Sequence, residues 1–133
     1  MNTNEAIQQL LNYLQDFKVH PRFIKELSSL LKKELKGKEK KFFNILITQL
    51  KNIQEFKTMI YTVDSNEKLL GYDGNFYSIH LQQSKFNVRF LVHITDGSIE
   101  LLVAFYERGG KKATNYSQYE GILEDRLNDL KGN

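Results

Sequence analysis

The sequence predicts an α+β fold. N-terminal helices (an extra helix plus a helical hairpin) pack on a small antiparallel sheet of three to four strands, with a helix at the C-terminus. Three observations predict this fold. Leucine and phenylalanine recur at helical spacing between residues 21 and 57. Apolar and polar residues alternate through residues 76–106, as expected for strands with one buried face. Apolar residues return to helical spacing near the C-terminus.

Three helices are expected before the sheet. Residues 4–15 form a short amphipathic helix, and residues 17–20 (FKVH) form a short strand. A second helix runs from Pro21, which suits its first turn, to about residue 36, and Gly37 then ends the pattern. A third helix runs from residue 39 to about residue 57. The second and third helices form a hairpin whose apolar stripes face the core.

The register of the last strand hairpin follows from its turn. Asp96 and Gly97 predict a two-residue type I′ turn, because these residue types tolerate the positive φ that this turn requires. Thr95 then pairs with Ser98, and each strand keeps its apolar residues on one face. The residues expected on the core face are Phe86, Val88, Phe90, Val92, Ile94, Ile99, Leu101, Val103 and Phe105.

The opposite face of the sheet is expected to be open and polar. In the predicted register Arg89 opposes Ala104, and Tyr106 opposes Asn87. His80 lies on the same face of the preceding strand, beside Asn87. We therefore expect His80, Arg89 and Tyr106 to converge on this face. Three basic residues follow the last strand and reach over from its loop: Arg108, Lys111 and Lys112.

Length and composition set the class of protein. A chain of 133 residues is expected to form one domain, residues 1–133, with residues 1–16 as a helical extension. The segment 117–120 fits a capping box that begins the last helix. The absence of cysteine excludes disulfides, zinc–thiolate sites and thiol catalysis. No apolar run approaches the ~20 residues of a membrane span, and no signal-peptide pattern occurs, so we expect a cytoplasmic protein without a membrane partner.

Positive charge is concentrated in the helical hairpin. The formal net charge is +3, but residues 18–57 hold eleven Lys and Arg against four Glu, a net charge of +7. The C-terminal segment, by contrast, leans acidic. This asymmetry favours a side that faces a polyanion, although a lysine-rich helix is more often just a solvated face.

The predicted open face carries the groups that metal-independent RNA cleavage needs. In that reaction a base removes the 2′-hydroxyl proton, cations stabilise the phosphorane, and an acid protonates the leaving 5′-oxygen. Histidine titrates near neutral pH, arginine matches phosphate, and tyrosine stacks on bases. The candidates are His80, Arg89, Tyr106 and Arg108 for catalysis and Lys111 and Lys112 for binding RNA phosphates.

Other interpretations of individual residues stay open. A single histidine on a sheet face is more often structural or merely exposed. His93 opposite Glu100 fits an ordinary cross-strand pair, and His20 before Pro21 fits a helix-entry residue. The sequence contains no metal-ligand spacing, no phosphate-binding glycine loop and no nucleophile elbow, so neither a metal nor a cofactor is expected.

Three segments, in this order, resemble the RelE/ParE superfamily of bacterial toxins. The junction of the family's first strand and helix is similar to VHPRFIKEL (19–27). Its lysine–leucine–glycine approach to a strand is similar to KLLGYDGNFYSIHL (68–81). Its hairpin, phenylalanine-rich strand end and basic loop are similar to NVRFLVHITDGSIELLVAFYERGGKKAT (87–114). The resemblance covers roughly residues 17–130 and implies a single RelE-like domain.

The resemblance implies the toxin of a toxin–antitoxin module. Such a toxin is a ribosome-associated, metal-independent mRNA endoribonuclease (an mRNA interferase) that inhibits translation, and its partners are a cognate antitoxin, the ribosome and mRNA. By position, Arg89 corresponds to the family's phosphate-holding central arginine. The basic residues after the last strand correspond to its strand-end cluster. His80 stands where the family often has arginine, so His80 and Tyr106 are both candidates for the base.

The alternative is a non-enzymatic binder on the same fold, either a gyrase inhibitor of the ParE type or a protein-interaction module. This alternative is favoured if the N-terminal helix covers the open face, or if His80 and Arg89 are dispensable. The N-terminal helix is itself a candidate for packing on the sheet, for binding the antitoxin, or for forming a homodimer.

Overall fold

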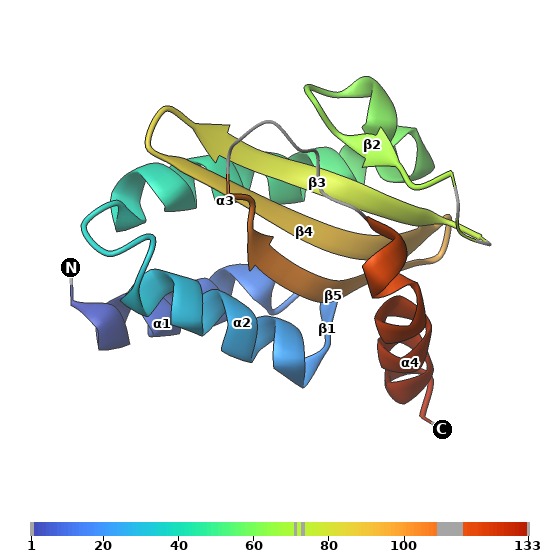
Figure 1. The fold of residues 1–133 in the computed structure, drawn as a ribbon, viewed down its shortest axis with the longest axis horizontal. Coiled ribbons are helices and arrows are strands. Elements are labelled where there is room, and N and C mark those ends of the chain that lie inside the picture. The colour runs from blue at the N-terminus through green and yellow to red at the C-terminus, as the bar shows by residue number, and fades with distance from the viewer. Residues whose placement is uncertain (1, 71, 73, 109–115, 133) are drawn as a thin grey trace.

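A five-stranded sheet with helices on both faces forms the protein (Figure 1). The computed structural model describes residues 2–70, 72, 74–108 and 116–132. The predicted α+β class with a C-terminal helix is confirmed. Along the chain the elements are α1 (Thr3–Leu14), β1 (Lys18–Val19), α2 (Pro21–Lys32), α3 (Glu39–Phe56), the 3₁₀ helix η1 (Lys57–Thr62), β2 (Glu67–Lys68), β3 (Phe76–Gln83), β4 (Phe86–Thr95), β5 (Ser98–Tyr106), the 3₁₀ helix η2 (Tyr116–Tyr119) and α4 (Glu120–Leu130).

The sheet is larger than predicted, and it is mixed rather than antiparallel. Its strand order is β1-β5-β4-β3-β2. The short strand expected at residues 17–20 is present as β1, but it pairs in parallel with β5. β2 adds a second two-residue edge strand, antiparallel to β3. Strands this short carry no readable alternation, so their partners and directions follow only from the tertiary packing.

The helical hairpin forms as predicted, with an earlier end to its first helix. Pro21 occupies the first position of α2, and the ring Nδ1 of His20 accepts a hydrogen bond from the N–H of Arg22 at 3.0 Å. This interaction caps the helix and confirms His20 as its entry residue. The chain leaves α2 after Lys32 and turns at Gly37, whose φ of 83° favours glycine.

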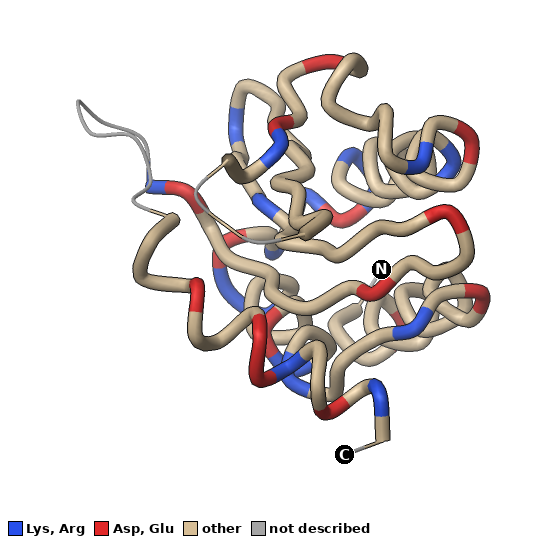
Figure 2. Tube along the Cα trace, turned by 90° about the vertical axis from the view of Figure 1, so that its right-hand side faces the viewer, with Lys and Arg blue, Asp and Glu red and all other residues tan. Residues whose placement is uncertain are grey.

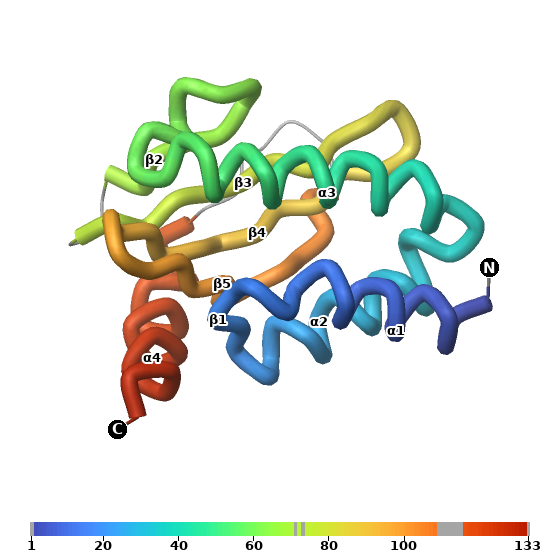
Figure 3. The backbone as a smooth tube through the Cα atoms, turned by 180° about the vertical axis from the view of Figure 1, so that it is seen from behind, coloured from blue at the N-terminus to red at the C-terminus, as the bar shows by residue number. Residues whose placement is uncertain are grey.

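The main core lies between the helices and one face of the sheet. Figure 3, which views the molecule from the side opposite to Figure 1, shows α3 crossing in front of the sheet, with α1 and α2 beside it. Helix α1 contributes Ala6, Leu10 and Leu14 to this core, so it packs on the hairpin and not on the opposite face of the sheet. The largest fully buried side chains here include Phe23, Phe42, Tyr77 and Phe90.

The opposite face of the sheet, predicted to be open, is covered at one end. Helix α4 packs on β5 there and closes a second apolar cluster over the sheet (Figure 1). Phe105 stacks on Tyr119 of η2, with ring centroids 5.1 Å apart. This cluster consists of Leu69, Phe76, Leu91, Leu102, Val103, Leu123 and Leu127.

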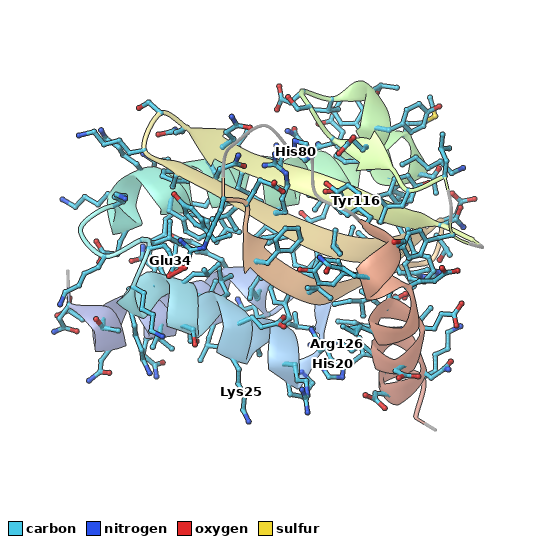
Figure 4. The ribbon with its side chains drawn as sticks, viewed as in Figure 1. His20, Lys25, Glu34, His80, Tyr116 and Arg126 are labelled. Atoms are coloured by element: carbon cyan, nitrogen blue, oxygen red, sulfur yellow. The ribbon has the colours of Figure 1, made fainter. Side chains whose placement is uncertain are left out.

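Two polar contacts attach α4 to the start of the hairpin. The guanidinium of Arg126 forms a bidentate ion pair with Glu26 of α2, at 2.8 and 3.0 Å. Nε2 of His20 lies 2.9 Å from the Asp129 carboxylate. Figure 4 shows Arg126 and His20 together where α2 meets α4, and Figure 2 marks the acidic positions along α4. The helix begins at Glu120, after η2, so its N-cap is Tyr119 and not Ser117, the first residue of the predicted capping box.

The β4–β5 turn has the predicted length but not the predicted conformation. Thr95 pairs with Ser98 as expected. Neither Asp96 nor Gly97 has a positive φ, so the type I′ assignment is wrong.

Of the described residues, none belongs to a helix that combines the length and the apolar character needed to cross a membrane.

Candidate functional site

His80 and Arg89 lie directly opposite each other in the middle of the sheet, on the face away from the main core. The register of β3 and β4 pairs them. Directly opposed side chains of antiparallel strands share a face, with β carbons about 5 Å apart. The sequence places His80 beside Asn87 instead. The structure differs because the β3–β4 turn contains only residues 84–85, which moves His80 onto Arg89.

Glu67 of β2 sets the tautomer of His80. Nε2 of His80 lies 3.0 Å from Oε2 of Glu67. A carboxylate only accepts hydrogen bonds, so Nε2 of the neutral ring carries the proton and Nδ1 holds the lone pair. Nδ1 can therefore take a proton, and Glu67 would stabilise the imidazolium that results.

Tyr116 and Ser78 extend this hydrogen-bonded chain. The Tyr116 hydroxyl donates to Oε2 of Glu67 at 3.2 Å and lies 2.9 Å from Oγ of Ser78. Because the tyrosine proton points to Glu67, the serine hydroxyl is the donor in the second contact. Figure 4 shows His80 and Tyr116 on the viewer's side of the sheet. One carboxylate thus holds an imidazole and a phenol together.

The charge states in this cluster follow from burial. Burial lowers the pKa of His80 below its ordinary value of 6.5, the positive charge of Arg89 lowers it further, and Glu67 acts in the opposite direction. Burial also raises the pKa of Tyr116 above its ordinary value of 10.0. At neutral pH the cluster therefore offers an unprotonated imidazole and a protonated phenol.

Arg89 is a buried cation with an unused donor. Only 8% of its surface is exposed, and its Nη1 donates to Oδ1 of Asn87. Within the described residues, no carboxylate pairs with it, and both its Nε and the Nδ1 of His80 are buried without hydrogen-bond partners. Buried polar atoms nearly always have partners. The pair therefore offers an unused donor for an anionic oxygen and an unused acceptor for a hydroxyl.

The backbone at His80 is held by side chains rather than by a neighbouring strand. Because β2 begins only at Glu67, which pairs with Ser78, the outer edge of β3 has no strand partner at His80 among the described residues. Asn66 accepts from the N–H of His80 at 2.8 Å, and Gln49 of α3 donates to its carbonyl at 2.8 Å. Both side chains are buried, so they fix the position of His80 relative to α3.

Tyr106 lies on the core face, so the predicted convergence is wrong for this residue. β5 contains a bulge at Leu102, where its pairing with β4 shifts by one residue. One extra residue turns every later side chain to the other face. Phe105, rather than Ala104, therefore opposes Arg89, and Tyr106 packs against the main core.

The bulge is stabilised by side chains from two helices. Nη1 of Arg126 donates to the Leu102 carbonyl at 2.8 Å, and Oε1 of Glu26 accepts from the N–H of Ala104 at 3.2 Å. Residues 101–105 are all apolar, so hydrophobic alternation fits either register along this stretch. The bulge also corrects the predicted faces of Val103 and Phe105, which belong to the second cluster and not to the main core.

Of the other predicted site residues, one makes its contacts away from the His80–Arg89 pair and two lie outside the described residues. The Arg108 side chain is 80% exposed, pairs at 3.6 Å with Glu34 in the turn after α2, and lies 5.9 Å from the centre of the Tyr106 ring. Its described contacts are thus to the hairpin side of the sheet. Lys111 and Lys112 lie outside the described residues.

The remaining histidines have structural partners, as the sequence indicates. His93 opposes Glu100, and its Nδ1 lies 2.7 Å from the Glu100 carboxylate. His20 caps α2 and contacts Asp129. In the described part of the chain, no group of three or more His, Cys, Asp or Glu residues is placed to hold a metal ion.

Sequence reasoning missed two central members of this cluster, Glu67 and Tyr116. Glu67 lies on a two-residue strand, and Tyr116 on a 3₁₀ turn, so neither stands in a periodic pattern. Comparison of the chain with family models, with curated proteins and with solved structures found no match.

Proposed function

We propose that the protein is a RelE-like toxin of a toxin–antitoxin module, acting in the cytoplasm as a ribosome-associated, metal-independent mRNA endoribonuclease. The observation that supports this proposal most is the pairing of a neutral, carboxylate-oriented His80 with a buried Arg89 that has no carboxylate partner among the described residues. The pair offers one site for a proton and one for a phosphate. A cognate antitoxin, the ribosome and mRNA are the proposed partners.

The proposed reaction uses the unpaired atoms of the site. Nδ1 of His80 takes the proton of the ribose 2′-hydroxyl, and the 2′-oxygen then attacks the adjacent phosphorus. Arg89 donates from Nε to a phosphate oxygen as negative charge builds up. The bond from phosphorus to the 5′-oxygen breaks, and that oxygen takes the hydroxyl proton of Tyr116, which is protonated at neutral pH and exchanges its hydrogen bond to Glu67 for one to the leaving oxygen. Glu67 holds the imidazolium in place.

Two of the atoms that would contact the substrate, Nδ1 of His80 and Nε of Arg89, are buried. Substrate binding at His80 and Arg89 therefore requires the groups that cover them to move. This requirement is consistent with an enzyme whose site is completed by a large RNA-bearing partner such as the ribosome.

A matched set of variants tests the proposal. Arg89→Met and His80→Gln each remove one reacting group while keeping side-chain size, and Arg22→Met makes the same change at an exposed arginine of α2. We expect wild type and Arg22→Met to arrest bacterial growth when induced, and the two site variants to lose the arrest while remaining folded by circular dichroism. Undiminished arrest by both folded site variants would remove the assigned site.

The alternative, a non-enzymatic binder of the ParE type or an interaction module, is favoured by a different surface. Phe56, Met59 and Tyr61, at the end of α3 and on η1, are exposed, and Leu70 is 87% exposed. Large exposed apolar side chains favour protein partners. The N-terminal helix packs in the main core and does not cover the His80 face, so that expected sign of a binder is not met. Loss of arrest on Met59→Ser and Tyr61→Ser, with arrest retained in Arg89→Met, would favour the binder.

A further inference from the structure

The N-terminus, the α2–α3 connection and the β3–β4 turn lie at the same end of the molecule (Figures 1 and 3). Residues of these three segments line a hollow that is rich in lysine. Its volume is about 900 Å³. The five lysines that line it are Lys36, Lys38, Lys40, Lys41 and Lys85.

The charge of this hollow is almost unopposed. Among the described residues, Glu39 is the one acidic residue that lines it, and the Glu39 side chain is buried and accepts a hydrogen bond from the N–H of Gly37 at 3.2 Å. Lys38 spans the hollow, because its Nζ donates to the carbonyls of Glu34 and Lys85, each at 3.1 Å. The other four lysines are exposed, and none of them forms an ion pair within the described residues.

These lysines are placed where they oppose the stability of the free protein. Lys40 and Lys41 lie in the first turn of α3, where the helix dipole disfavours positive charge. Like charges gathered around one hollow also repel each other. An anionic ligand would offset both effects. A face that is only solvated gains nothing from lysines at the N-terminal end of a helix.

Among its described lining residues, the hollow lacks the exposed apolar anchors of a protein-binding site. The exposed large apolar side chains lie elsewhere, on α1, on η1 and the end of α3, after β2, and on α4. Phe86, the aromatic residue that lines the hollow, is 2% exposed. Binding here therefore depends on charge, and regularly spaced phosphates are the ligand that lysines hold as point charges.

We propose that this lysine hollow binds the phosphate backbone of single-stranded RNA, next to the strand whose phosphate Arg89 holds. The inference rests on the proposed function in that it takes the RNA from the same substrate. β3 runs from His80 toward the turn at residues 84–85, roughly 13 Å along the strand, a span that a few nucleotides cover. The hollow would then hold the RNA in register for cleavage without reading its sequence.

Binding of an uncleavable RNA tests the proposal separately from cleavage. A short fluorescein-labelled 2′-O-methyl RNA is titrated with the full-length protein over a range of salt concentrations. The hollow is altered in two independent variants, Lys40→Gln/Lys41→Gln and Lys36→Gln/Lys85→Gln. The control, Lys25→Gln/Lys51→Gln, removes the same charge from exposed positions outside the hollow. Figure 4 shows Lys25 pointing away from the molecule.

We expect each hollow variant to weaken binding on the order of 20-fold at 0.1 M salt, and to reduce the slope of log K against log salt by about 1.4, as two lost phosphate contacts predict. The melting temperature of Lys40→Gln/Lys41→Gln should be unchanged or higher, because the helix dipole no longer opposes two cations. The control should bind like the wild type.

Three results would overturn the proposal: no binding by the wild-type protein, an equal loss in the control, or displacement of the RNA by poly-glutamate at matched charge. The last result would assign the hollow to an acidic protein segment. If induction of the protein produces no new transcript ends but the hollow variants still lose RNA binding, the proposed function fails while the hollow assignment stands.

Discussion

Replacing Arg126 with methionine should destabilise the protein through one buried polar junction. The Arg126 guanidinium joins three elements, since it pairs with Glu26 of α2 and donates to the Leu102 carbonyl at the bulge of β5. Its side chain is 10% exposed. Methionine keeps most of the side-chain packing but none of these hydrogen bonds, so the change isolates the polar contribution.

The expected loss of unfolding free energy can be worked out from these contacts. A buried carbonyl left without its donor costs about 1–3 kcal/mol. The Glu26 carboxylate loses its partner as well, but it is 31% exposed, so water limits that cost to about 1 kcal/mol. The sum is about 2–4 kcal/mol. For a chain of this length that corresponds to a fall in melting temperature of roughly 10 °C.

Urea denaturation of a double-mutant cycle measures this effect. The cycle combines Arg126→Met with Glu26→Gln, and the exposed change Arg22→Met serves as the control, which we expect to stay within about 0.5 kcal/mol of wild type. The two changes should couple by about 1–2 kcal/mol, because the second removes the carboxylate that the first leaves unpaired. A loss below about 0.5 kcal/mol in Arg126→Met, or strict additivity, would refute the junction.

Three further predictions concern the site. The pKa of His80 in the folded protein lies below its ordinary value of 6.5, so the unfolded chain binds a proton first as the pH falls below about 6.5. The free energy of unfolding should therefore decline below that pH. His80→Gln should flatten this part of the pH profile of unfolding. An unchanged profile would contradict the buried neutral state. Tyr116→Phe removes the hydroxyl that bonds Glu67 and Ser78, and should lower the unfolding free energy by about 1 kcal/mol in urea; no change would mean that these bonds do not hold η2. Arg108→Ala should alter stability by less than about 0.5 kcal/mol, because its ion pair is exposed, and a larger loss would show that this pair is more than a surface contact.

Long periodic segments of this chain are predictable, and the short connecting ones are not. The hairpin, β4 and the turn at residues 96–97 follow from local pattern, and each lies where expected within a few residues. Helix α2 ends at Lys32, but its apolar stripe continues, since Leu35 in the following turn is fully buried. Burial and helical conformation are therefore separable at a helix end.

Only part of the site can be predicted from the sequence, because its geometry depends on contacts between residues that are distant in sequence. His80 and Arg89 stand on long strands, so alternation puts them on one face. The bulge that removes Tyr106 from that face depends on Arg126 and Glu26, which no local pattern connects to β5. The carboxylate of Glu67, likewise, reaches His80 only through the pairing of a two-residue strand.

Genome-wide mapping of transcript 5′ ends after a short induced pulse tests whether the protein cleaves mRNA at the His80–Arg89 pair. Wild type and Arg89→Met are compared in the same bacterial host. We expect new ends confined to translated reading frames for wild type, and none for Arg89→Met. Growth arrest without new ends, or the same ends from both proteins, would contradict RNA cleavage at the His80–Arg89 pair.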